Sequence, residues 1–381
     1  MKAKGTDDGL RVGLFHPNAN VHFGSARSPE LNPDLLDIQT HTNLASACEA
    51  AGFDYLFMAD SWLPYGPESS RIGWRDPYLF SPILGGAIAA VTRRIGIITT
   101  IHTSLFHPVQ VARMGATLDA LSGGRWGLNV VTGTSSSAGL ISNEFGRIDH
   151  DARYDAAHEA MALLRALWSG EQVDHEGPYY QVHGKVVGPR TVQRPMPLIV
   201  SAGASPAGRR FAAHHADTIF MPGRTPRETL HAAMDDIGAQ AAERGRKVSL
   251  QVHVSVLVRE TDAEADRVSA DLKASVHLPA VAEYLKFISA LSTTYEDIYA
   301  RYSENDMRQV GLVSGGLQAH GGPDRVAATL IGLYRECGVR GVALTFPLWH
   351  PSEVELFGRL VLPRLAEAGI WVHPADRDWC W

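Results

Sequence analysis

The sequence predicts an α/β protein in which eight parallel strands close into a (β/α)8 TIM barrel. Short, β-branched apolar runs alternate with amphipathic helical segments along the 381 residues, and eight such runs are present. Strands that are separated by helices pair in parallel through right-handed crossovers, and eight of these units close naturally into a barrel. A doubly wound open sheet is the alternative arrangement of the same elements.

The strands are predicted from apolar runs that begin with VGLF and YLFM, continue with IGIITTI, WGLNVVT, LIV and TIFM, and end with LQVHVSVLV and VALTF. In chain order they cover residues 12–15, 55–58, 95–101, 126–132, 198–200, 218–221, 250–258 and 342–346. The helices, in which apolar residues recur at spacings of three and four, cover residues 35–50, 79–91, 109–121, 153–167, 226–244 and 325–337. Gly52 and Gly338 each stand between a helix and a strand, where the chain commonly needs a positive φ.

Four segments are longer than the usual connections of such a barrel, and we expect them to be insertions in one domain that spans residues 1–381. They cover about residues 61–77, 133–150, 170–194 and 273–320, and a short C-terminal tail follows at 369–381. Segment 170–194 is predicted to form a small strand pair, whereas the other three emerge at the C-terminal face, where barrel enzymes keep their chemistry. Segment 273–320 is either a mobile lid, with Arg301 or Arg308 meeting an anionic substrate, or a helical excursion packed against an oligomer partner.

Composition excludes several classes of protein. Hydrophobic residues make up 45% and charged residues 20%, which is typical of a globular protein, and no run approaches the roughly 18 apolar residues of a membrane helix. The start of the chain lacks the apolar core of a secretory signal, so a cytoplasmic location is expected. A net charge of −6 argues against nonspecific binding to nucleic acid or anionic lipid. Three cysteines are too few for a disulfide framework or a thiolate metal site.

Three small groups of residues are candidates for chemistry. The Gly/Ser loop 202–208 follows the fifth strand and opens a helix, so its N–H groups and the Ser205 hydroxyl either hold an anion or merely cap the helix. His150 and Tyr154 share one face at the start of a helix, where they either donate to a ligand or satisfy the helix terminus. Asn129 lies within the fourth strand and Thr100 within the third, and an inward polar residue near the end of a barrel strand is well placed to meet a ligand.

Metal catalysis and hydrolysis are disfavoured. The chain has 17 histidines, but His102, His107 and the pair His214-His215 lack the spacing of known metal motifs. No G-x-S-x-G nucleophile elbow is present either. We therefore expect no metal site.

Several motifs together resemble the bacterial-luciferase-like flavin monooxygenases. The resemblance covers about residues 11–368, with weak matching in the late insertion. It is carried by Ala112-Arg113-Met114, Leu118-Asp119, Leu121-Ser122-Gly123-Gly124-Arg125, Asn129-Val130-Val131-Thr132, His150 with Arg153-Tyr154, Ser201 to Gly208, and Ala212 to Asp217. Within the family, the chain is most similar to the branch of nitrilotriacetate, dibenzothiophene sulfone, dimethyl sulfone and pyrimidine monooxygenases.

The resemblance implies a luciferase-like TIM barrel that takes reduced FMN (FMNH2) from a separate NAD(P)H-dependent flavin reductase. Such enzymes activate O2 as a flavin peroxide, at C4a or N5, and oxygenate a small organic substrate such as a sulfone, sulfonate, amine, amide or heterocycle. They also form homodimers or homotetramers. An F420-dependent oxidoreductase of the same fold and a catalytically silent flavin-binding protein are the alternatives.

The matched positions imply roles for six residues. Those that match flavin-contacting positions are Asp60, Thr100, Asn129, His150, Tyr154 and Ser205. Ser205 and Tyr154 meet the FMN phosphate, Thr100 and Asn129 lie beside the reactive ring edge, and Thr100, Asn129 and His150 are the catalytic candidates. The chain departs from the family pattern at residues 134–138, where many relatives carry a Trp, at His102, where a small residue is usual, and in the tail 371–381.

Overall fold

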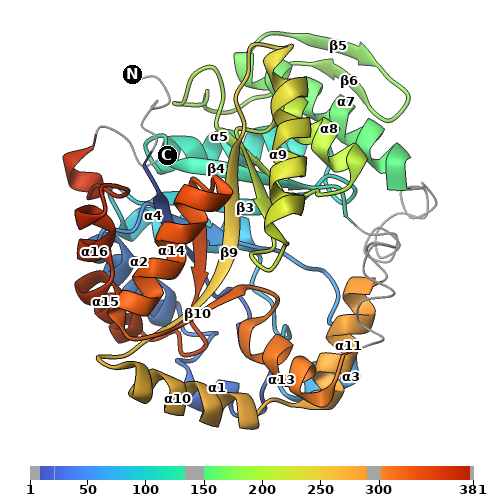
Figure 1. Cartoon of the computed structure of the whole chain (residues 1–381). Coiled ribbons are helices and arrows are strands. Elements are labelled where there is room, and N and C mark those ends of the chain that lie inside the picture. The colour runs from blue at the N-terminus through green and yellow to red at the C-terminus, as the bar shows by residue number, and fades with distance from the viewer. Residues whose placement is uncertain (1–8, 21, 134–149, 290–301, 378–381) are drawn as a thin grey trace.

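Eight parallel strands form a closed ring, as the alternation of strands and helices predicts (Figure 1). The computed structural model describes residues 9–20, 22–133, 150–289 and 302–377. The strands of the ring, in order around it, are β1 (Arg11–Phe15), β2 (Tyr55–Met58), β3 (Gly96–His102), β4 (Trp126–Val131), β7 (Leu198–Ser201), β8 (Thr218–Met221), β9 (Ser249–Val258) and β11 (Gly341–Thr345). Because β11 pairs with β1 and β8 pairs with β9, the ring has no open edge, and the open-sheet alternative is excluded.

A ninth parallel strand, β10 (Leu317–Gly321), lies outside the ring and was not predicted from the sequence. It pairs with β9 from Val254 to Val258, beyond the residues Ser249 to Val252 of β9 that pair with β8. With ten residues, β9 extends beyond its partners, and β10 covers the edge that would otherwise be exposed. Its sequence, LQAHG, contains no apolar run that distinguishes it from a loop.

Helices surround the ring, and their boundaries follow local capping signals. They are α1 (Ser28–Leu31), α2 (Ile38–Ala51), α3 (Pro67–Arg71), α4 (Ser81–Val91), α5 (Pro108–Leu121), α7 (His150–Ser169), α8 (Pro206–His215), α9 (Arg227–Ala242), α10 (Asp262–Ala274), α11 (Leu278–Ser289), α13 (Glu304–Val313), α14 (Pro323–Cys337), α15 (Pro351–Leu360) and α16 (Leu362–Glu367). Helix α2 begins three residues later than predicted because Asp37 caps it by accepting a hydrogen bond from the N–H of Gln39. The predicted positive φ is confirmed at Gly52 (91°) and Gly338 (68°).

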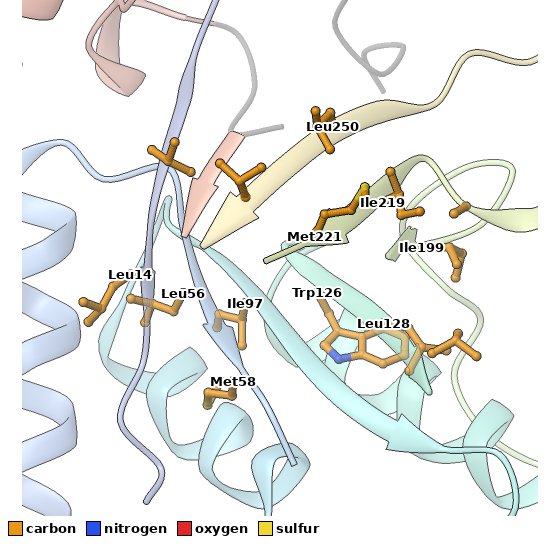
Figure 2. Close-up of a cluster of buried hydrophobic side chains, with 14 of the residues drawn as sticks. Leu14, Leu56, Met58, Ile97, Trp126, Leu128, Ile199, Ile219, Met221 and Leu250 are labelled. Carbon is orange, nitrogen blue, oxygen red and sulfur yellow. The ribbon is translucent and has the colours of Figure 1, made fainter. Parts of the chain in front are cut away.

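Because successive side chains of each strand point to opposite faces, the apolar side chains of the barrel form two layers. Outward side chains such as Leu56 and Leu128 pack beneath the helices, and Figure 2 shows part of this cluster. The inner layer fills the barrel and consists of Tyr55, Phe57, Ile98, Leu198, Val200 and Ala343, with Phe15 and Phe220 packed against it. Since successive side chains of a strand point to opposite faces, Thr100 shares the inner face with Ile98, and Asn129 is opposite in direction to Leu128.

The longer connections lie at the two ends of the barrel. The antiparallel pair β5 (Val173–Glu176) and β6 (Gln181–Gly184) confirms the strand pair predicted within 170–194 and lies at the top of Figure 1. Helices α3, α10, α11 and α13 lie together at the bottom of that view. Side chains of α10, α11 and α13 share a second apolar cluster with Phe23 and with Trp74, which follows α3. Within the described ranges, no helix combines the length and apolar character needed to cross a bilayer.

Candidate active site

The two polar residues predicted on neighbouring strands, Thr100 and Asn129, lie side by side inside the barrel. They occupy the same register position on β3 and β4. Both are almost fully buried, with 1% and 3% of their surface exposed. The Asn129 Nδ2 donates a hydrogen bond of 2.9 Å to the Thr100 Oγ1. The structure therefore brings together two residues that are 29 positions apart in the chain.

The hydroxyl proton of Thr100 determines how the amide of Asn129 is oriented. Thr100 donates that proton to the Met58 carbonyl at 2.8 Å, so only its lone pairs face Asn129. The amide nitrogen must then point to Thr100 and the Oδ1 away from it. The Asn129 Oδ1 is buried and accepts no hydrogen bond from any residue in the described ranges. Because an unsatisfied buried acceptor costs about 1–3 kcal/mol, this oxygen is ready to accept a bond from a ligand.

Asp60 follows β2 and is connected to the same pair through Ser81. The Ser81 hydroxyl lies 3.4 Å from the Asp60 Oδ2, 3.2 Å from the Thr100 carbonyl and 3.1 Å from the Thr100 N–H. The Ser61 N–H donates to the other carboxyl oxygen of Asp60 at 2.8 Å. Burial nevertheless raises the pKa of Asp60 to about 7. This carboxyl therefore gains and loses its proton near neutral pH.

The raised pKa of Asp60 predicts how stability changes with pH. In the unfolded chain the carboxyl titrates near 4, so between pH 4 and 7 the folded state binds more protons, and folding stability falls as pH rises through this range. We expect Asp60→Asn to remove this loss. The free energy of unfolding of the variant should therefore rise by about 2 kcal/mol relative to that of the parent between pH 5 and pH 8. Urea unfolding of both proteins across this range measures the difference. Asp76→Asn, in the same loop but exposed, is the control, and parallel stability curves for Asp60→Asn and the parent would contradict the assignment.

Tyr154 and Ser205 meet at the loop that precedes α8. Ser205 caps this helix, and its Oγ accepts a hydrogen bond of 3.2 Å from the Gly208 N–H. A capping hydroxyl keeps its own proton to donate to an anion, so the capping interpretation and the anion interpretation are compatible. Tyr154 is buried on α7, and a Cβ placed on Gly203 would lie 2.3 Å from its hydroxyl oxygen. The phenol of Tyr154 therefore lies directly against the Gly/Ser loop.

His150 cannot be placed with the others. It is the first residue of α7, and its side chain lies outside the described residues, as do residues 134–149. The role expected for His150 stays a prediction. Arg301 also lies outside the described ranges, whereas Arg308 pairs with Glu304 at 2.8 Å and donates to the Ala274 carbonyl.

Buried histidines at the mouth of the barrel were not predicted as part of the site. His102 lies two residues beyond Thr100, on the same inner face of β3. Its Nε2 donates to the Asp60 carbonyl at 3.2 Å, so its buried Nδ1 is an acceptor, and it has no partner in the described part of the chain. Burial lowers the pKa of His102 and that of His253 to about 4, which keeps both rings neutral at pH 7. The alternation of Ile98, Thr100 and His102 is the sequence signal that identifies this position.

Metal ligands do not gather here or elsewhere in the residues that the structure describes. No group of three or more His, Cys, Asp or Glu side chains in these ranges is arranged to hold a metal ion. His158 and His215 contact each other at 2.7 Å between ring nitrogens, and His214 packs against them.

Comparison with known proteins identifies the family. The profile of the luciferase-like monooxygenases matches residues 10–341. The FMNH2-dependent dimethylsulfone monooxygenase of Pseudomonas putida is 30% identical over 87% of this chain and 89% of its own length. The long-chain alkane monooxygenase of Geobacillus thermodenitrificans is 29% identical over 95% of this chain and 91% of its own length.

A solved structure supports the same assignment at the level of the fold. The crystal structure of a long-chain alkane monooxygenase is 26% identical, covers 100% of this chain and 95% of its own, and superposes with a TM-score of 0.85. The match of the family profile extends from β1 to the first residue of β11 and so includes the other seven strands of the ring in full. The chain belongs to the luciferase-like family of flavin-dependent monooxygenases.

Proposed function

We propose that this protein is the oxygenase of a two-component system, in which a separate NAD(P)H-dependent reductase supplies FMNH2 and the barrel uses it with O2 to oxygenate a small organic substrate. The observation that carries this proposal is the buried, unsatisfied Asn129 Oδ1, held in place by Thr100 inside the barrel. The FMNH2 dependence of the Pseudomonas putida relative supports the choice of cofactor. A homodimer or homotetramer is part of the proposal.

The described residues fit a reduced flavin at two places. At one, the Ser205 hydroxyl, the Tyr154 phenol and the start of α8 would hold the phosphate, since N–H groups and hydroxyls at a helix N-terminus favour anions. At the other, Asn129 Oδ1 and His102 Nδ1 are buried acceptors, which suit ring N–H donors. The reduced ring carries an N–H where the oxidised ring has an acceptor nitrogen, so this pair of acceptors favours FMNH2.

The chain itself contributes an apolar inner layer and neutral hydrogen-bonding partners. Bound FMNH2 supplies the electrons that activate O2. Phe57 and Phe220 stack with their ring centres 4.9 Å apart, and Phe15 packs against both, which excludes water from the inner end. Asn129 and His102 are neutral at pH 7 and therefore hold the ring without adding a fixed charge. Asp60 carries an exchangeable proton at its carboxyl near neutral pH.

Anaerobic titration with FMN, riboflavin and F420, each in reduced form, tests the proposal. We expect the parent to bind reduced FMN more tightly than riboflavin or F420. Tyr154→Phe and Ser205→Ala should each weaken the binding of reduced FMN by about 1–2 kcal/mol, which is the value of one hydrogen bond to a charged group. Neither substitution should change the binding of riboflavin, which has no phosphate. Tighter binding of F420 would instead favour an F420-dependent oxidoreductase.

Ser205→Asp separates loss of the phosphate site from loss of the helix cap. Aspartate caps helices as well as serine does, so α8 and the thermal midpoint should be preserved. Its negative charge should repel the phosphate and weaken FMN by more than Ser205→Ala does. If FMN and riboflavin weaken equally in these variants, Ser205 does not lie at the phosphate.

A further inference from the structure

Arg75 occupies an aromatic cage in the segment that follows β2. Its guanidinium carbon lies 4.3 Å from the ring centre of Tyr65, 4.7 Å from that of Phe287 and 5.9 Å from that of Tyr78. The backbone of Arg75 has a φ of 66°, a left-handed conformation that costs a residue with a side chain about 1–3 kcal/mol unless its surroundings enforce it. The cage therefore holds this arginine in a defined position.

The charge of Arg75 has no carboxylate within ion-pair distance in the described ranges. Its Nη2 donates to the Ser61 hydroxyl, and its buried Nε has no hydrogen-bond partner among the described residues. Arg71, in the same segment, is by contrast paired with Glu68 at 2.6 Å. Aromatic faces stabilise a guanidinium but accept no conventional hydrogen bonds from its edge. The guanidinium edge of Arg75 therefore has N–H groups that can donate to an anionic ligand.

The position of Arg75 links it to the candidate active site. Ser61, which accepts its hydrogen bond, also donates to the carboxyl of Asp60 through its backbone N–H at 2.8 Å. Asp60 does not fully neutralise the cation at neutral pH because burial raises its pKa to about 7. Beside this segment, Trp62, Phe80 and Phe106 pack with ring centres 5.6–5.8 Å apart and form an apolar wall.

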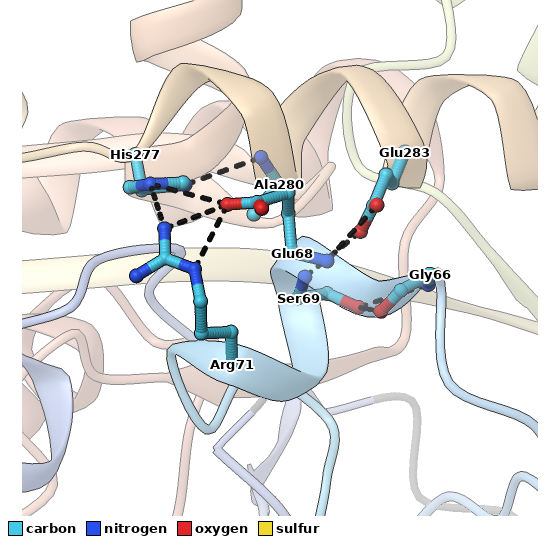
Figure 3. Close-up of polar contacts among 7 residues, drawn as sticks. All are labelled: Gly66, Glu68, Ser69, Arg71, His277, Ala280 and Glu283. Atoms are coloured by element: carbon cyan, nitrogen blue, oxygen red, sulfur yellow. Dashed lines mark hydrogen bonds and ion pairs between the residues drawn. The ribbon is translucent and has the colours of Figure 1, made fainter.

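Hydrogen bonds between α3 and α11, here called the polar clasp, join the two segments that build the cage (Figure 3). Glu283 of α11 accepts hydrogen bonds of 3.0 and 2.8 Å from the N–H groups of Glu68 and Ser69 in α3. His277, at the start of α11, contacts Arg71 at 2.9 Å. Tyr65 and Tyr78 come from the α3 side of the clasp and Phe287 from the α11 side. The cage is therefore assembled by the protein itself, before any ligand binds.

We propose that Arg75 binds the anionic group of the substrate, and that the substrate is an organic acid whose carboxylate or sulfonate meets the guanidinium while its apolar body lies against Trp62, Phe80 and Phe106. This inference rests on the proposed function, because it names the substrate class of the same site. Of the two arginines named for this role in the sequence analysis, Arg308 pairs with Glu304 and Arg301 lies outside the described residues.

Calorimetric titration with four probes tests the inference in the protein without flavin and again with reduced FMN bound. Benzenesulfonate and benzoate are the anions, and methyl phenyl sulfone and benzamide are their uncharged counterparts of similar shape. We expect the parent to bind each anion at least tenfold more tightly than its counterpart. Arg75→Met, which keeps the apolar stem, should weaken the anions 10- to 100-fold and leave the neutral probes unchanged, and Arg75→Lys should lie between. The sulfonate and carboxylate arms show which group is preferred.

Arg227→Met is the control, because Arg227 is also exposed and paired with a glutamate but lies on α9, outside the clasp. This variant should bind all four probes like the parent. The inference is overturned if the parent binds no anion better than its neutral counterpart, or if Arg75→Met weakens anionic and neutral probes equally. Titration of the same preparations with reduced FMN separates the two proposals. Flavin binding without anion selectivity contradicts only the substrate class, and anion selectivity without flavin binding contradicts only the proposed function.

Discussion

Arg377→Met is expected to lower the free energy of unfolding by about 3–5 kcal/mol, the loss typical of breaking a buried ion pair from one side. The Arg377 Nη2 lies 2.5 Å from the Asp54 Oδ1, and the two side chains are 6% and 0% exposed. The other oxygen of Asp54 accepts the Val12 N–H at 2.8 Å. Methionine fills similar space but leaves the carboxylate buried without its counter-charge.

A double-mutant cycle with Asp54→Asn measures this pair. Guanidinium unfolding of the parent, both single variants and the double variant should show that Arg377→Met destabilises Asp54→Asn much less than it destabilises the parent. Arg359→Met is the control, because Arg359 and Glu260 form an ion pair with side chains 62% and 60% exposed, and it should change stability by no more than about 1 kcal/mol. A change below about 1 kcal/mol for Arg377→Met would show that the pair contributes little.

The effect of Arg377→Met should also depend on pH with a defined sign. Burial raises the pKa of Asp54 to about 6, although Arg377 favours its charged form. Without Arg377 this pKa rises further, so the folded state retains the proton to higher pH and loses stability as pH increases. The loss caused by Arg377→Met should therefore be larger at pH 8 than at pH 5.

This ion pair gives the C-terminal tail a structural role that the sequence did not predict. The tail lies beyond the match of the family profile, yet the Leu10 N–H donates to the Ile370 carbonyl, Trp371 is buried, and Arg377 reaches the start of β2. These contacts join residues from opposite ends of the chain. Neither periodicity nor local capping signals carry information about such distant partners, so only the folded structure identifies them.

The elements of the barrel were predictable because their causes are local. The runs that became β2 and β8 were predicted to the residue, since a four-residue apolar run between turn signals has few other stable states. The inward positions of Thr100 and Asn129 were expected because they are polar residues within apolar runs. Strand β10 was missed because its pairing depends on the length of β9, and Arg75 was missed because its cage combines residues of α11 with the segment after β2.

The orientation of the Asn129 amide could not be predicted either, because it depends on which group accepts the hydroxyl proton of Thr100. This orientation is expected to have a large effect on flavin binding. We expect the parent to bind FMNH2 more tightly than FMN, since the Asn129 Oδ1 accepts from the additional ring N–H of the reduced form. Asn129→Ala removes this acceptor and should reduce the ratio of the two dissociation constants by about 5- to 150-fold, equivalent to about 1–3 kcal/mol. Anaerobic titration with both flavin forms measures the ratio.

Thr100→Val distinguishes the orientation of the amide from its mere presence. Valine neither donates to the Met58 carbonyl nor accepts from Asn129, so the amide becomes free to turn and to present either its oxygen or its NH2 group to the flavin. Oxidised FMN, which has an acceptor where FMNH2 has a donor, should then bind more tightly than it binds to the parent, whereas in Asn129→Ala it should not. If both variants keep the parent's ratio of dissociation constants, the two residues do not contact the part of the flavin that changes on reduction. If Asn129→Ala alone reduces the ratio, the oxygen of Asn129 accepts from FMNH2, but Thr100 is not what fixes its direction.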